Sequence, residues 1–102
     1  MSIRPVYIGT YSPAHAGDVE DLAIDVTNDL ATGETLSSVV FTVTNGAGTV
    51  QAGAVTAQTV VSPLVSFRMT IPATVDTYTI TAVCTMSDER VVTHTASLRV
   101  VT

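Results

Sequence analysis

The sequence of 102 residues contains no lysine, no tryptophan and only one cysteine. The lone Cys84 excludes an internal disulfide, and its position in a run of alternating apolar residues predicts a small buried side chain. No apolar run approaches the length of about 18 to 20 residues that a membrane-spanning helix needs. The first residues also lack the apolar core of a signal peptide. We therefore expect a protein that is made in the cytoplasm, does not enter a membrane and is not exported by the usual route.

Positive charge is scarce, because four arginines face nine acids and give a formal net charge of −5. Between Pro5 and Phe67 the sequence has no arginine at all. Most of the acids lie in that stretch: Asp18, Glu20, Asp21, Asp25, Asp29 and Glu34. Phosphate binding needs a basic face on the protein. The composition therefore argues against nucleic acid as a partner.

Motifs that carry catalysis are also missing. The sequence contains no G-x-S-x-G elbow, no P-loop and no H-E-x-x-H motif. His15 lies in a segment rich in proline and glycine, whereas His94 alternates with apolar residues and is expected to pack at the core or its rim. Cys84 and His94 together are too few ligands for zinc. We expect no enzymatic activity, no catalytic residue, no cofactor and no metal site.

The abundant feature is the alternation typical of β-strands. Valine and threonine, which suit a pleated surface, make up about a third of the chain. Residues 78–86 and 91–101 alternate on either side of the polar turn 87–90, which predicts a hairpin. Its first strand is expected to bury one set of side chains: Tyr78, Ile80, Ala82, Cys84 and Met86.

Residues 18–30 allow two interpretations. Leu22, Ile24 and Val26 alternate with Asp21, Ala23, Asp25 and Thr27, which favours a half-buried strand. Alternatively, Asp18 could cap a helix that places Leu22, Val26 and Leu30 on one face. The sequence alone does not decide between strand and helix here.

The middle of the chain predicts further strands. Residues 36–44 form one, and the pair Asn45-Gly46 after it is typical of a tight hairpin turn. Residues 49–56 and 58–61 are weaker candidates for edge strands, which Ser62-Pro63 interrupts. Residues 64–71 form a clear strand. The predicted core contains Val39, Phe41, Phe67, Met69, Ile80, Cys84 and Leu98.

About seven short strands with turn signals between them predict an all-β fold. Specifically, we expect an immunoglobulin-like β-sandwich of antiparallel strands over residues 18–102. Tyr78 opens the penultimate strand, where such domains often place a tyrosine whose hydroxyl bonds back to the preceding corner. Simple filling of the core is the alternative role for Tyr78.

Residues 1–17 are expected to form an extended N-terminal arm, which prolines and glycines break up and which could include a short first strand. Its apolar side chains are costly to leave in water, yet they cannot extend one regular strand: Ile3, Val6, Tyr7, Ile8 and Tyr11. We expect a neighbouring chain of a multi-copy assembly to bury them.

A second candidate interface consists of acids: Asp18, Glu20, Asp21, Asp25 and Asp29. On a strand, Asp21, Asp25 and Asp29 would share the solvent face. They could ligate calcium through oxygen, although the spacing fits no calcium loop. A solvated face that resists aggregation is favoured over calcium ligation, and a patch that orients a basic partner is the third interpretation.

Several short motifs occur together. They are an acidic opening (17–25), the turn Gly33-Glu-Thr-Leu-Ser37, Phe41-Thr-Val43, and Tyr78-Thr-Ile-Thr81 with Leu98-Arg-Val100. In this combination the chain resembles the small phage fibre-tail adaptor family, over about residues 17 to 100. The resemblance implies an immunoglobulin-like structural protein of the virion, made in the host cytoplasm, with no catalytic residue.

The resemblance also implies partners. Such an adaptor works in several copies, as a homo-oligomer or ring at the neck or tail, and contacts connector, tail, fibre or capsid subunits. A capsid decoration protein that stabilises the head is the alternative within this class. A host-surface or carbohydrate-binding module is a further alternative, but the lack of tryptophan counts against it because sugar sites use aromatic faces.

Overall fold

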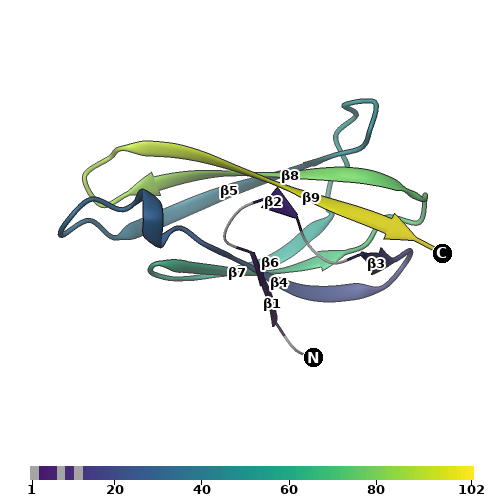
Figure 1. The fold of residues 1–102 in the computed structure, drawn as a ribbon, viewed down its shortest axis with the longest axis horizontal. Helices are drawn as coiled ribbons and strands as arrows, with labels where there is room; N and C mark the ends of the chain where they lie inside the picture. Colours follow the sequence, from purple (N-terminus) through teal and green to yellow (C-terminus); the bar gives the residue numbers. More distant parts are fainter. Residues whose placement is uncertain (1–2, 7–8, 11–12) are drawn as a thin grey trace.

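The computed structural model of the chain describes residues 3–6, 9–10 and 13–102. It is an all-β structure with two sheets, which Figure 1 shows as two layers. The first sheet has the strand order β1 (Ile3–Val6), β4 (Val19–Asp25), β7 (Leu64–Thr70) and β6 (Val55–Val61). The second has the order β2 (Gly9–Thr10), β9 (Val91–Val101), β8 (Asp76–Met86) and β5 (Leu36–Thr44), with β3 (Ala14–His15) also on β9.

Alternation along the strands builds one core between the two sheets. The predicted inward set of β8 is confirmed, because every member is buried: Tyr78, Ile80, Ala82, Cys84 and Met86. The other predicted core positions on β5, β7 and β9 are also buried, with the exception of Phe41. Burial raises the pKa of the Cys84 thiol, as expected for an apolar environment.

Phe41 is only half-buried, so its assignment to the core is wrong in part. It lies on β5, the edge strand of the second sheet, and its ring packs on Phe67 of β7 with centroids 4.3 Å apart. An edge strand has no neighbour on one side, so a large ring there keeps some of its surface in solvent. A β-bulge between Leu36 and Ser38 turns both Leu36 and Val39 inward.

Residues 19–25 form the strand β4, which confirms the strand interpretation and makes the helix interpretation wrong. β4 pairs antiparallel with β7 along its whole length. The chain then turns, because the carboxylate of Asp25 accepts hydrogen bonds from the N–H of Thr27 (2.8 Å) and from its hydroxyl. The 3-10 turn η1 (Thr27–Asp29) follows.

The tight hairpin predicted at Asn45-Gly46 is wrong. The side-chain oxygen of Asn45 accepts hydrogen bonds from the N–H groups of Ala47 (3.0 Å) and Thr49 (2.9 Å), which stabilises a wider loop. The positive φ falls on Gly48 (84°) and not on Gly46. Beyond this loop the chain crosses to the first sheet, and β5 pairs with β8 instead of with the next strand.

Residues 18–102 contain six strands rather than about seven, because β6 alone stands where two weak strands were predicted. β6 is an edge strand, as expected. The pair Ser62-Pro63, with a cis peptide bond, forms the turn between β6 and β7. Proline is tolerated there because the turn needs no N–H for the ladder.

Two hydrogen bonds connect the second sheet to the segment around β6. The side-chain amide of Gln58 on β6 donates to the carbonyl of Val39 (2.7 Å), and the N–H of Gln51 donates to the carbonyl of Val43 (2.7 Å). Both acceptors lie on β5. These bonds therefore occupy part of the free edge of β5.

The first three strands lie within residues 1–17, which were predicted to be an arm. β1 pairs parallel with β4, and β2 and β3 pair parallel with β9. Pro5 fits β1 because this strand lies at the edge of its sheet. The first segment therefore contributes to both sheets, and the boundary predicted at residue 17 does not separate it from them. The fold is also not purely antiparallel.

Tyr78 fulfils both of its predicted roles. Its side chain is buried in the core, and its hydroxyl donates a hydrogen bond to the backbone carbonyl of Thr74 at 2.8 Å. Burial, with the charge of Asp76 nearby, raises the pKa of Tyr78. The bond fixes the corner that precedes β8.

Candidate interaction surfaces

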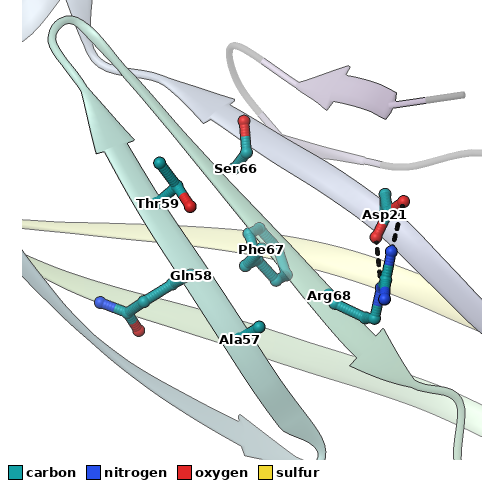
Figure 2. A pocket seen from close by; sticks show the side chains of 7 residues that line it. All are labelled: Asp21, Ala57, Gln58, Thr59, Ser66, Phe67 and Arg68. Carbon is teal, nitrogen blue, oxygen red and sulfur yellow. Dashed lines mark hydrogen bonds and ion pairs between the residues drawn. The ribbon is translucent and has the colours of Figure 1, made fainter.

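A shallow hollow of about 360 Å³ lies on the outer face of the first sheet. Strands β4, β6 and β7 supply its lining: Asp21, Ala57, Gln58, Thr59, Ser66, Phe67 and Arg68. Figure 2 shows Asp21 and Arg68 joined by an ion pair on one side of the hollow. The hydroxyl groups of Thr59 on β6 and Ser66 on β7 lie further along these two strands. The hollow thus offers polar groups and no exposed aromatic platform.

Asp21 and Arg68 face each other directly on β4 and β7. The guanidinium donates through Nε to Oδ1 (2.8 Å) and through Nη2 to Oδ2 (3.3 Å). This hydrogen bonding holds the pKa of Asp21 below its ordinary value, against the opposing effect of burial, and raises the pKa of Arg68. The Arg68 side chain is 54% exposed, so solvent screens the pair and limits its contribution to stability.

A second charged group lies where the turn after β8 meets the segment between β4 and β5. Arg90 donates through Nε to Glu34 Oε2 (3.0 Å) and through Nη2 to Oε1 (2.6 Å), and also to the carbonyl of Asp29. The N–H of Ala31 donates to Glu34 Oε1 at 2.8 Å. Chiefly because of Arg90, and then of Ala31, the pKa of Glu34 falls to about 2. This group ties two distant segments together.

His94 lies on the inner side of β9, at the rim of the core, as predicted. Its Nε2 lies against the carboxylate of Asp29 in η1. The imidazole and the carboxylate are in contact without a well-directed hydrogen bond. This position fits a packing role, with the imidazole covering one end of the core.

The predicted acidic face does not form as expected. Asp21 and Asp25 lie on one face of β4, but Asp29 lies beyond the strand, because the chain turns at Thr27. Asp21 pairs with Arg68, Asp25 bonds Thr27 and Asp29 contacts His94. Asp18 is exposed and Glu20 is half-buried. These acids therefore make contacts within the chain and do not form a single shared patch. Residues 3–6, 9–10 and 13–102 contain no cluster of three or more His, Cys, Asp or Glu side chains able to hold a metal ion.

The predicted apolar interface of the arm is only partly within the described residues. Ile3 and Val6 are the first and last residues of β1, at the edge of the first sheet. Tyr7, Ile8 and Tyr11 lie outside the described residues. The burial of these side chains against a neighbouring chain stays a prediction.

The outer face of the second sheet is the surface that sequence analysis missed. The outward positions of residues 38–44, 79–85 and 91–97 are all threonine, valine or serine. Arg99, opposite Thr77, lies beyond one end of this face. A signal was present in the sequence, because residues 35–67 contain no charged residue and include the whole of β5. We call these outward positions the uncharged face.

No helix in the described part of the chain is long and apolar enough to cross a membrane. No protein-family model matches this chain, and no curated protein matches it.

Proposed function

We propose that this chain is a non-enzymatic structural protein of a tailed bacteriophage, working in several copies as an adaptor between the neck or tail and the fibres. The observation that carries the proposal is the strand order. β4-β7-β6 facing β9-β8-β5 corresponds to the order B-E-D facing G-F-C of an immunoglobulin-like domain, whereas β1, at the place of strand A, pairs with β4 in parallel, and β2 and β3 extend the second sheet beyond β9. This correspondence supports the immunoglobulin-like topology that the resemblance to the phage adaptor family implies.

The surfaces also support a role in assembly. The cores of protein interfaces are depleted of charged residues. The uncharged face meets this condition over three adjacent strands, although the chain as a whole has a net charge of −5. Other virion proteins, and further copies of the chain, are the partners that the proposal requires.

Purified phage particles test this proposal. The chain should be found by mass spectrometry among the virion proteins, in several copies per particle. Particles that lack the chain should have intact heads but lose their fibres. Particles that keep their fibres but lose heat resistance of the head would instead identify a capsid decoration protein. Absence of the chain from purified particles would contradict both roles.

A host-surface or carbohydrate-binding module is the second candidate, and the hollow beside Arg68 is the feature that favours it. Hydroxyl and charged groups can bond sugar hydroxyls. If the hollow holds a sugar, the purified chain should bind a glycan array, and Arg68→Ala should abolish the signal. Its matched control is Arg99→Ala, which removes the same charge away from the hollow. If the chain binds no glycan, the second candidate is wrong and the structural role remains.

A further inference from the structure

We propose that the uncharged face binds the same face of a second copy of this chain. The inference deepens the proposed function and rests on it for one point, that several copies of the chain work together. The face lies over β5, β8 and β9. Its positions on β5 and β9 are exposed to solvent, except for the half-buried Thr44 and Ser97, and Val40 on β5 is 66% exposed. Figure 1 draws no described strand or helix across the outer side of β8.

Charge explains why a second copy fits this face. Two copies with a net charge of −5 repel each other wherever their acids meet. Within the uncharged face no carboxylate or guanidinium would have to lose its hydration or face a like charge. A positively charged partner would find nothing on this face to recognise, whereas a second copy meets no electrostatic penalty here.

Hydrogen bonding gives a second reason. A hydroxyl both donates and accepts a hydrogen bond, so a surface of threonine and serine is complementary to itself. The three strands carry these hydroxyls in cross-strand rows, for example Thr42, Thr81 and Thr95. Another row contains the apolar pair Val40 and Val83. A two-fold axis that lies in the interface plane above β8 and runs parallel to this strand would bring each row near its counterpart in the second copy.

The size of the face sets the expected strength. Strand spacing and rise give a flat area of roughly 350 Å² per copy, or roughly 700 Å² for two copies before the relief of the side chains is counted. Stable interfaces usually bury about 1,200 to 2,000 Å². We therefore expect a weak dimer, with a dissociation constant in the micromolar range or above, that becomes effective where many copies are held together.

Analytical ultracentrifugation of the full chain over a wide concentration range tests the inference. The wild-type chain should dimerise, and Val40→Lys should raise the dissociation constant at least about tenfold, because it places like charges across the interface. Val61→Lys is the matched control, since Val61 is 68% exposed on the edge strand of the other sheet. It should leave the dimer unchanged. Circular dichroism would verify that both variants are folded.

Cross-linking adds a measurement that does not depend on a charge change. Thr81→Cys, at the centre of the uncharged face, should be joined between copies by a short bis-maleimide. Thr59→Cys, on the outer side of the first sheet, should not. Cys84 is buried and should not react.

Three outcomes would overturn the inference: a wild-type chain that is monomeric at every concentration, loss of the dimer with Val61→Lys but not with Val40→Lys, or cross-linking of the Thr59→Cys variant in place of the Thr81→Cys variant. If the wild-type chain stays monomeric but Val40→Lys fails to enter particles, a different virion protein occupies the face. None of these results touches the proposed function, because that is tested by the content of purified particles.

Discussion

The two outer faces of this protein are built by the same alternation and yet differ in character. The face of the first sheet has the ion pair of Asp21 and Arg68 beside a hollow, whereas the uncharged face of the second sheet carries only threonine, valine and serine over three strands, with Arg99 beyond its end. Both sheets bury similar apolar residues on their inner sides. Folding requires apolar side chains on the inner side of each sheet, but it does not determine which side chains occupy the outer side. The difference between the outer faces therefore carries information about contacts with other molecules.

The largest expected effect separates the inside of the second sheet from its outside. Leu98→Ala should lower the free energy of unfolding by about 2 to 5 kcal/mol, because Leu98 is fully buried on β9 and its truncation leaves a cavity. Val40→Ala, on the uncharged face, should change it by no more than about 0.5 kcal/mol. Urea denaturation at neutral pH measures both. A large loss of unfolding free energy with Val40→Ala would show that this face stabilises the fold itself, so that the inner and outer sides of the sheet would not differ in this respect.

The next effect concerns charge, which is placed away from the uncharged face. Arg90 lowers the pKa of Glu34 to about 2 from an ordinary value of 4.5. A lowered pKa in the folded state contributes stability that is fully present above the ordinary value and is lost as the pH falls through the folded value. The urea concentration at the midpoint of unfolding should therefore decrease as the pH is lowered from 4.5 to about 2.

In this pH window the wild-type chain should take up protons when it unfolds, and Glu34→Gln should reduce the number taken up by about one. Glu89→Gln, which makes the same change in charge at the nearby turn, is the control. Equal pH slopes for Glu34→Gln and the wild-type chain would show that another carboxylate governs acid unfolding.

The smallest effect is expected at the ion pair of the first face. Asp21→Asn removes a contact whose arginine is more than half exposed, so the melting temperature should fall only slightly at low salt. The difference from the wild-type chain should vanish at about 1 M salt, where charges are screened within a few ångströms. A large loss that persists at high salt would mean that Asp21 and Arg68 support the fold and do not merely decorate its surface.

Local pattern in the sequence was enough to predict the hairpin of β8 and β9. Its inward side chains follow strict alternation, and the polar turn between the strands has no competing interpretation. The strand β4 was only one of two interpretations, because Leu22, Ile24 and Val26 have the spacing of a strand while Leu22, Val26 and Leu30 have the spacing of a helix. The burial of Cys84 followed directly from its place in the alternation of β8.

Hydrogen bonds of single side chains and contacts between distant segments decided what the alternation pattern could not. The side chain of Asn45 bonds two backbone groups of its own loop, so a pair typical of tight turns does not form one. Phe41 has the right alternation for the core, but the position of β5 at the edge of its sheet leaves it half exposed. Asp21 looked like part of an acidic patch until the pairing of β4 with β7 placed Arg68 opposite it. The uncharged face likewise appears only when three separate strands are brought side by side.

The hydrogen bonds from Gln58 and Gln51 to β5 also protect this chain against edge-to-edge aggregation. Proteins often guard the exposed edge of a sheet with lysine, whose charge keeps a second edge from pairing with it. This chain has no lysine, and β5 lies in a stretch without any charge. Amide groups instead occupy the carbonyls of Val39 and Val43. Because this guard consists of satisfied hydrogen bonds and not of charge, it keeps its effect at salt concentrations and pH values that would disable a charged one.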